Sequence, residues 1–188
     1  MVYDDYKKFL AEVLISEEKL QQRVAELGRE ISQDYAGEDL LLVCVLRGGV
    51  MFLTDMMHHL TVPHMVDFMA ISSYGVGARK TSGTVRITMD LNMDIYGQNV
   101  LIVEDIVDSG YTLASLLEVL ETRHPKSLKV CTLLDKAARR EIDVRLDYVG
   151  FDIDDKFVFG YGLDLDEYYR DLPFVGVVDL DAYTPPED

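Results

Sequence analysis

The sequence predicts an α/β fold built on a mostly parallel sheet with helices on both faces. Residues 40–46, 100–103 and 128–134 are predominantly apolar without alternation, so these strands are expected to be buried on both faces. Segments with helical periodicity, residues 50–60 and 112–123, alternate with them. This order is typical of parallel sheets whose ligands bind at the carboxyl ends of the strands.

The composition narrows the classes of partner. The chain has 188 residues, with 34 acidic and 18 basic side chains and a formal net charge of −16. A surface of this sign repels polyanions, which argues against binding to nucleic acid or to an anionic membrane. Because 48% of the residues are hydrophobic and no linker-like stretch occurs, we expect one domain over residues 1–188.

Targeting signals and cysteines indicate the compartment. The longest apolar run, residues 40–46, is much shorter than the ~20 residues that cross a bilayer. Charged side chains near the N-terminus argue against a secretion signal. Cys44 and Cys131 lie within apolar runs, where a thiol behaves as a small apolar group. We therefore expect no membrane helix, no disulfide and a cytoplasmic protein.

The first half of the chain carries clear element signals. Ser16, followed by two glutamates, predicts a helix start, and the helix should end before Gly37. The strand at residues 40–46 leads into a glycine turn, residues 47–49, before the helix at residues 50–60. The apolar stripe of the first helix consists of Leu20, Val24, Leu27 and Ile31.

Two further strands are expected at residues 64–73 and 84–89. The segment between them contains Gly75, Gly77 and Gly83. A glycine-rich connection of this length predicts a mobile loop.

Residues 100–112 carry the most specific chemistry. A buried strand is expected to deliver Glu104 and Asp105 to its end, and a turn containing Gly110 opens the next helix. Backbone amides of this turn, the hydroxyls of Ser109 and Thr112 and the positive end of the helix dipole suit a phosphate group.

The adjoining carboxylates suggest a second kind of contact. Glu104 and Asp105 would repel a phosphate unless they accept hydrogen bonds from ribose hydroxyls or hold Mg²⁺. Ribose 5-phosphate satisfies both halves of the segment. The alternative is that Glu104, Asp105 and Asp108 are solvated loop acids in an acidic protein.

Residues 100–112 resemble the phosphoribosyl-pyrophosphate signature of the type I phosphoribosyltransferases. Further segments along nearly the whole chain are similar, in order and spacing, to the hypoxanthine-guanine branch of that family. These segments are residues 46–49, 66–69, 72–75, 133–136, 149–152, 155–164 and 169–173. The resemblance implies a mostly parallel sheet with a small hood made from the chain termini, mainly the C-terminal part, and a flexible loop over residues 73–84.

The resemblance also implies a reaction. Hypoxanthine or guanine would displace pyrophosphate from phosphoribosyl pyrophosphate, giving IMP or GMP in purine salvage, with Mg²⁺ as cofactor. We expect the chain to form a homodimer or a homotetramer.

Site residues follow from the same resemblance. Asp108 matches the acid that exchanges a proton with purine N7, and Ser73 and Tyr74 match the closing loop that excludes water. The metal would be held by Glu104, Asp105 and Asp164. The ribose and 5-phosphate set is Glu104, Asp105, Asp108, Ser109, Gly110, Tyr111 and Thr112.

The resemblance assigns the pyrophosphate group to Arg47, Gly48 and Arg170. The family often has a cis peptide bond before the basic residue at the position of Arg47. Many members have lysine at the position of Arg47. A guanidinium suits pyrophosphate, yet Arg47 could be a solvated turn residue and Arg170 a surface ion pair.

The purine is assigned to Lys136 at the 6-oxo group, Phe157 stacking on the ring, Val158 bonding its edge and Asp164 near the base. Composition offers plainer interpretations. Lys136 could form a solvated basic corner with Arg139 and Arg140, Asp164 an exposed acidic turn, and an apolar phenylalanine is more often a core residue.

Two other functions stay open at this point. The same fold serves in regulatory proteins that sense phosphoribosyl pyrophosphate and bind nucleic acid, although a net charge of −16 disfavours a basic face. The chain could also be a transferase for xanthine, adenine or orotate. Lys136 argues against adenine, whereas xanthine is not excluded.

Overall fold

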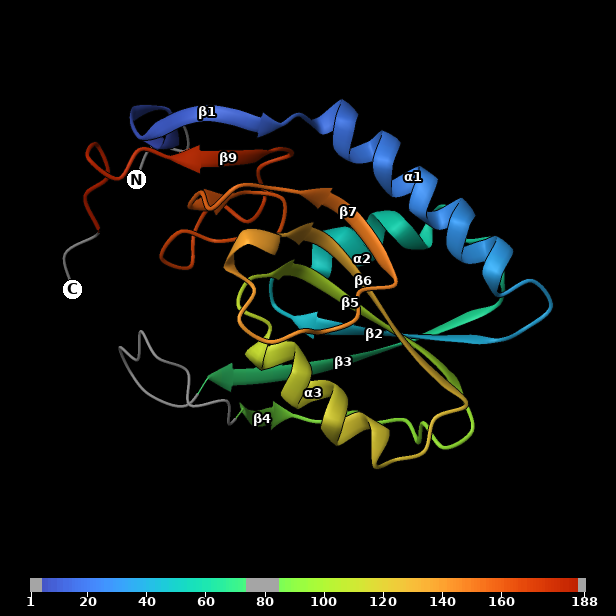
Figure 1. The fold of residues 1–188 in the computed structure, drawn as a ribbon. Helices are drawn as coiled ribbons and strands as arrows, with labels where there is room; N and C mark the ends of the chain where they lie inside the picture. Colours follow the sequence, from blue (N-terminus) through green and yellow to red (C-terminus); the bar gives the residue numbers. More distant parts are fainter. Residues whose placement is uncertain (1–4, 74–84, 186–188) are drawn as a thin grey trace.

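The structure, a computed structural model, describes residues 5–73 and 85–185 (Figure 1). Tyr74 and the loop predicted over residues 74–83 lie outside the described residues. Along the chain the elements are a 3-10 helix (Asp5–Lys8), β1 (Leu10–Ile15), α1 (Glu17–Asp34), β2 (Leu40–Leu46), α2 (Val50–Met57), β3 (His64–Ser73), β4 (Val85–Met89), β5 (Asn99–Val107), α3 (Tyr111–Glu121), β6 (Ser127–Asp135), a 3-10 helix (Ala137–Arg139), β7 (Tyr148–Asp152), β8 (Val158–Phe159) and β9 (Val175–Val178).

The main sheet confirms the predicted α/β class. Within the described residues it has six strands in the order β4-β3-β2-β5-β6-β7. Strands β2, β3, β5, β6 and β7 are parallel, and β4 is an antiparallel edge strand paired with β3. Leu41 of β2 lies opposite Val100 of β5, which in turn lies opposite Leu128 of β6.

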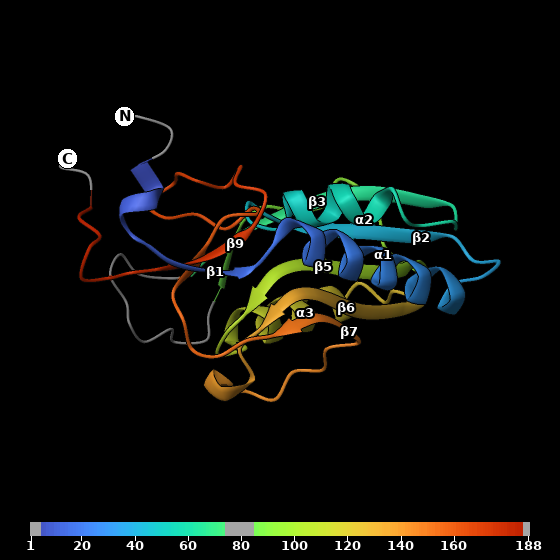
Figure 2. The same ribbon diagram turned by 90° about the horizontal axis from the view of Figure 1, so that it is seen from above.

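Helices cover both faces of this sheet, which explains why its strands show no polar alternation. Leu42 of β2 packs in the core shared with α1 and α2, whereas the next residue, Val43, packs in the core shared with α3. In Figures 1 and 2, α1 and α2 lie on one side of the strands and α3 on the other. Ser16 caps α1 by accepting from the N–H of Lys19 at 3.4 Å, as the sequence predicts.

A small hood stands over one end of the main sheet and is made from both ends of the chain. Among the described residues its sheet has three antiparallel strands in the order β1-β9-β8. Leu10 of β1 pairs with Val178 of β9, and the two segments lie side by side in Figures 1 and 2. Its separate core contains Phe9, Phe159, Leu165, Leu172 and Val178.

Two element boundaries differ from the sequence prediction by three residues or more. Helix α2 ends at Met57 rather than residue 60, because the N–H groups of His58 and His59 bond three residues back and tighten the last turn. Strand β5 continues to Val107, so Glu104 and Asp105 lie within the strand and not beyond it. The reason is that β6 supplies partners for this extension, with Ile106 opposite Leu134.

No helix within the described ranges has the length and apolar character needed to cross a membrane. Cys44 and Cys131 are both buried and free, as expected from their apolar surroundings. Burial raises the pKa of the Cys44 thiol to about 12, so this thiol is uncharged and inert at neutral pH.

Candidate active site

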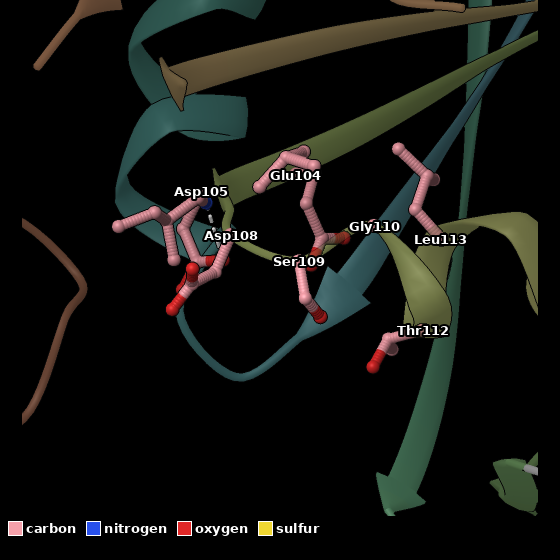
Figure 3. Close-up of a pocket in the computed structure, with 9 residues that line it drawn as sticks. Glu104, Asp105, Asp108, Ser109, Gly110, Thr112 and Leu113 are labelled. Atoms are coloured by element: carbon pink, nitrogen blue, oxygen red, sulfur yellow. Dashed lines mark hydrogen bonds between the residues drawn. The ribbon is translucent and has the colours of Figure 1, made fainter. Parts of the chain in front are cut away.

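The turn between β5 and α3 forms a cavity of about 180 Å³ at the carboxyl edge of the sheet (Figure 3). Gly110 ends the turn with φ +91°, a left-handed conformation that residues with a side chain rarely adopt. The N–H groups of Tyr111 and Thr112 lie in the first turn of α3, where no intrahelical acceptor exists. No side chain caps this helix among the described residues, so these donors are available to a ligand. The hydroxyls of Ser109 and Thr112 both point out of the same side of the turn in Figure 3. The arrangement suits an anion.

Two carboxylates line the same cavity. Glu104 Oε2 is buried and has no hydrogen-bond partner among the described residues, and burial, with a smaller contribution from Asp105, raises the pKa of Glu104 well above its ordinary value. Asp105 Oδ1 accepts from the N–H of Ile106 at 2.7 Å. Burial nevertheless raises the pKa of Asp105 to about 6, against the opposing effects of that N–H and of Arg170. A cation bound between these two buried acids would stabilise their charged forms.

Three segments converge beside Asp105. A Cβ atom on Gly48 would lie 1.4 Å from Asp105 Oδ2, and one on Gly162 would lie 2.0 Å from the carbonyl oxygen of Gly48. The turn after β2, the end of β5 and the loop after β8 consequently approach one another more closely than any side chain would permit. The Leu46–Arg47 peptide bond is cis, as the family resemblance implies.

Arg170 and Arg47 lie at this junction with acidic partners. Arg170 donates to the carbonyl oxygen of Gly162 at 2.9 Å and forms an ion pair with Asp164 at 2.7 Å. Both arginines also form ion pairs with Glu167. Asp164 raises and Arg170 lowers the pKa of Asp105, which places both near the buried acids. An adjoining apolar cavity of about 370 Å³ is lined in part by Leu46, Arg47, Met51, Gly162 and Arg170.

Lys136 directly follows β6, one strand from the acid pair. Its backbone N–H donates to the carbonyl oxygen of Val107 at 2.9 Å, and Nζ lies 3.7 Å from Asp155 Oδ1. The residue is only 8% exposed, so the interpretation as part of a solvated corner is wrong for Lys136. It is correct for its neighbour Arg139, whose side chain is 48% exposed.

Val158 is the first residue of the edge strand β8 of the hood sheet, and Phe157 directly precedes it. Phe157 is 52% exposed, so the interpretation as a core residue is wrong. Its carbonyl oxygen accepts from the N–H of Val178 at 2.9 Å. Because hydrogen-bonded and non-hydrogen-bonded pairs alternate in an antiparallel ladder, the N–H and C=O of Val158 face the open edge of the strand.

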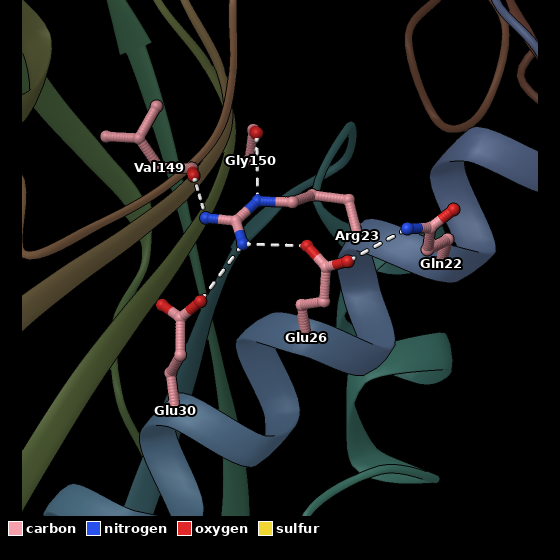
Figure 4. A network of polar contacts seen from close by, with 6 residues as sticks. All are labelled: Gln22, Arg23, Glu26, Glu30, Val149 and Gly150. Carbon is pink, nitrogen blue, oxygen red and sulfur yellow. Dashed lines mark hydrogen bonds and ion pairs between the residues drawn. The ribbon is translucent and has the colours of Figure 1, made fainter.

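The loop that carries Phe157 is anchored through β7, the strand before it. The guanidinium of Arg23, on α1, donates to the carbonyl oxygens of Gly150 at 3.1 Å and Val149 at 2.9 Å (Figure 4). Glu26 and Glu30 hold the same guanidinium from α1. Sequence patterns do not reveal these hydrogen bonds of Arg23, because the acceptors are backbone carbonyl oxygens.

The structure therefore brings the sequence-predicted residues to one edge of the main sheet and the adjoining hood. Ser73 is the last residue of β3, and Tyr74 lies outside the described residues. Asp108 is placed beside Arg139, whose Nε lies 2.8 Å from Asp108 Oδ1. Sequence reasoning missed Arg139, Asp155, Glu167 and Gly162 as members of this region. Asp155 and Gly162 lie inside the resembling segment 155–164, which was the available signal, whereas Glu167 and Arg139 lie outside the resembling segments.

Comparison with known proteins agrees with this geometry. The phosphoribosyl transferase domain matches residues 14–166. The chain is 52% identical over 184 residues to the hypoxanthine-guanine phosphoribosyltransferase of Mycobacterium avium, covering 95% of this chain and 90% of that protein. It is also 52% identical over 175 residues to the hypoxanthine phosphoribosyltransferase of Salmonella typhimurium, covering 92% of this chain and 98% of that protein.

Solved structures show the same fold. The hypoxanthine phosphoribosyltransferase of Staphylococcus aureus has a TM-score of 0.92 at 40% identity, covering 98% of this chain and 100% of that chain. The hypoxanthine-guanine phosphoribosyltransferase of Bacillus anthracis has a TM-score of 0.87 at 44% identity, covering 90% and 99%. The chain thus belongs to the phosphoribosyltransferase family, in the branch of the hypoxanthine and hypoxanthine-guanine phosphoribosyltransferases.

Proposed function

We propose that the protein transfers the 5-phosphoribosyl group of phosphoribosyl pyrophosphate to N9 of hypoxanthine or guanine, in purine salvage. The observation that carries this proposal is the buried Lys136 at the end of β6, which lies beside the phosphate-binding turn after β5 because its backbone N–H donates to the carbonyl oxygen of Val107. A buried ammonium with three donors and no acceptor recognises a carbonyl oxygen, which a 6-oxopurine provides.

The phosphate end of the site binds the sugar. The N–H groups at the start of α3 and the hydroxyls of Ser109 and Thr112 hold the 5-phosphate. Glu104 and Asp105 accept from the vicinal hydroxyls of the ribose. Arg47 and Arg170, with the backbone of Gly48, bind the pyrophosphate group, and Glu167 neutralises both guanidinium groups when pyrophosphate is absent.

The acid pair suits a divalent cation, and we assign it to Mg²⁺. Glu104 Oε2 is a buried acceptor without a hydrogen-bond partner among the described residues, and burial raises the pKa of both acids, an effect that a bound cation would oppose. No group of three acidic, histidine or cysteine ligands gathers within the described part of the chain. This fits Mg²⁺, which commonly binds one or two carboxylates together with substrate oxygens and water. Asp164, now paired with Arg170, would complete the set. When bound, the cation neutralises charge on the leaving pyrophosphate.

The purine end orients the base and moves a proton. The ring of Phe157 stacks on the purine, the outward backbone groups of Val158 bond its edge, and Lys136 donates to the 6-oxo oxygen. As N9 forms its bond to C1 of the ribose, the bond from C1 to pyrophosphate breaks. The purine proton at N7 passes to the carboxylate of Asp108, which lies in the same cavity as the phosphate-binding turn. We include Ser73 and Tyr74 in this proposal as the segment that excludes water.

Pyrophosphate release with five separate bases tests this function. We expect turnover with hypoxanthine and guanine in the presence of Mg²⁺, and none in excess EDTA. Adenine should fail because its 6-amino group faces another donor. Xanthine and orotate complete the panel. Efficient use of adenine, or full activity in EDTA, would contradict the proposal, and activity confined to xanthine or orotate would move it to another base.

We also propose that the chain acts as one domain in the cytoplasm and assembles as a homodimer or homotetramer. Two buried free thiols support a reducing compartment. The expected mass by light scattering is two or four times 21.3 kDa, together with a single cooperative unfolding transition. A monomeric mass, or two separate transitions, would contradict these assignments.

A further inference from the structure

Arg139 contacts two carboxylates on two different segments. Its Nε lies 2.8 Å from Asp108 Oδ1, on the turn after β5. Its Nη1 donates to Asp155 Oδ2 at 3.1 Å, on the loop between β7 and β8. The other oxygen of Asp155 lies 3.7 Å from Lys136 Nζ. The four groups therefore form a chain of alternating charge from Asp108 to Lys136.

These contacts have little weight for stability. The side chains of Arg139, Asp108 and Asp155 are 48%, 45% and 54% exposed. Exposed ion pairs typically contribute little to the free energy of unfolding, because water screens the charges and ordering the side chains costs entropy. Because the contacts of Arg139 add little to stability, they are better explained by the two carboxylates that they position, those of Asp108 and Asp155.

The geometry determines which atoms are left for the substrate. Arg139 Nε lies 2.8 Å from Oδ1 of Asp108, a buried oxygen that accepts no hydrogen bond among the described residues, so the contact orients this carboxylate as an ion pair and leaves its acceptors for the substrate. Asp155 holds the Lys136 ammonium at 3.7 Å, beyond hydrogen-bond distance, so its donors are not consumed. A guanidinium presents Nε and Nη1 in one rigid plane and can fix the directions of two carboxylates at once, whereas the lysine ammonium is a point charge on a flexible stem and fixes neither direction.

We propose that Arg139 is a positioning residue, which fixes the carboxylate of Asp108 and, through Asp155, the ammonium of Lys136 at two edges of the purine. This inference rests on the proposed function, since it concerns the same proton transfer and the same 6-oxo contact. Arg139 touches neither the sugar nor the phosphates in this account. Its loss should therefore slow the chemical step without weakening binding of phosphoribosyl pyrophosphate.

The test compares Arg139→Gln and Arg139→Lys with a matched control, Arg145→Gln. Arg145 also forms an ion pair, with Asp147 at 2.6 Å, but its side chain is 82% exposed and lies outside the site. In steady-state assays with hypoxanthine, we expect Arg139→Gln to lower kcat roughly tenfold to a hundredfold, as for a misplaced catalytic group. The KM for phosphoribosyl pyrophosphate should change by less than about twofold. Arg139→Lys should restore little of kcat, and Arg145→Gln should match the wild type.

A second set of variants tests the contact between Asp155 and Lys136. Asp155→Asn should raise the KM for hypoxanthine more than it lowers kcat, because it acts on Lys136. In the double variant Arg139→Gln/Asp155→Asn, the loss of kcat/KM for hypoxanthine should be smaller than the product of the two single-variant losses. Melting temperatures close to that of the wild type would show that the variants are folded.

Four results would overturn the inference while leaving the proposed function intact. These are Arg139→Gln behaving like Arg145→Gln, full restoration by Arg139→Lys, a rise in the KM for phosphoribosyl pyrophosphate as large as the fall in kcat, and strict additivity of the two variants. Wild-type protein that does not turn over hypoxanthine or guanine would instead refute the proposed function, and the inference with it.

Discussion

The two ends of the candidate site are built in different ways. The phosphate end comes from one continuous stretch, the end of β5, its turn and the start of α3. The purine end combines Lys136 after β6, Phe157 and Val158 at the start of β8 in the hood, and Asp164 in the loop beyond it. Backbone geometry over a few residues determines the first end, whereas the second exists only because the hood packs over the sheet. A substitution at the phosphate end should therefore disturb only its neighbours in the chain. A substitution at the purine end should also act through the contacts that hold its separate segments together.

The largest effect is expected from a substitution that affects the purine end alone. Lys136→Met keeps most of the side-chain length but removes the donor to the 6-oxo group, so kcat/KM for hypoxanthine and guanine should fall by up to ~10⁴-fold. Binding of phosphoribosyl pyrophosphate, measured by calorimetry, should be retained because the phosphate end is intact. An unchanged base preference in this variant would return Lys136 to a structural role.

A smaller effect is expected at the phosphate end. Asp108→Asn keeps the size of the side chain but cannot accept a proton, so kcat should fall roughly 10²-fold with little change in either KM. The matched control is Asp143→Asn, an exposed carboxylate outside the site. Equal turnover of the two variants would remove Asp108 from proton transfer.

The acid pair makes a prediction about stability and pH. The pKa of Asp105 is raised from 3.8 to about 6, so between these values the native state holds a proton that the unfolded state releases. The free energy of unfolding should therefore fall as pH rises through this window and stay lower above it. In EDTA, Asp105→Asn should be more stable than the wild type at pH 8 by about 3 kcal/mol and similar at pH 3.5.

Urea unfolding at the two pH values measures this difference. Asp143→Asn again serves as the control and should show no such pH dependence. A stability gain of Asp105→Asn that is the same at both pH values would mean that burial of the charge is not its cause.

The mildest change is expected where the two ends of the site meet. In Gly48→Ala the new methyl group would overlap Asp105 Oδ2, and this carboxylate is already held by the N–H of Ile106. We expect kcat/KM to fall roughly tenfold through the displaced carboxylate. Gly37→Ala is the control: no described atom lies within 4 Å of its Cβ position, and the strain from its φ of +82° should lower stability away from the site without changing kcat/KM. Similar activity of both variants would show that the close approach at Gly48 has no functional consequence.

The sequence by itself determined the elements whose signals are local. Strand β2 begins and ends where its apolar run does, α1 starts after the Ser16 cap, and the turn at Gly110 follows from residues 100–112. The assignment of Arg47, Lys136 and Phe157 to ligands came from family resemblance. Composition alone favoured a core position for Phe157, and that interpretation was wrong.

Only the tertiary structure decided the contacts between distant segments. The pairing of β5 with β6 carried Glu104 and Asp105 into the strand, and the approach of Gly162 to Gly48 brought the hood loop over the sheet. The contact of Arg139 with Asp108 likewise joins two loops that are separate in the chain. The physical reason is that hydrophobic periodicity and capping act over a few residues. Register between strands and ion pairs between loops depend on how whole elements pack, which no local pattern encodes.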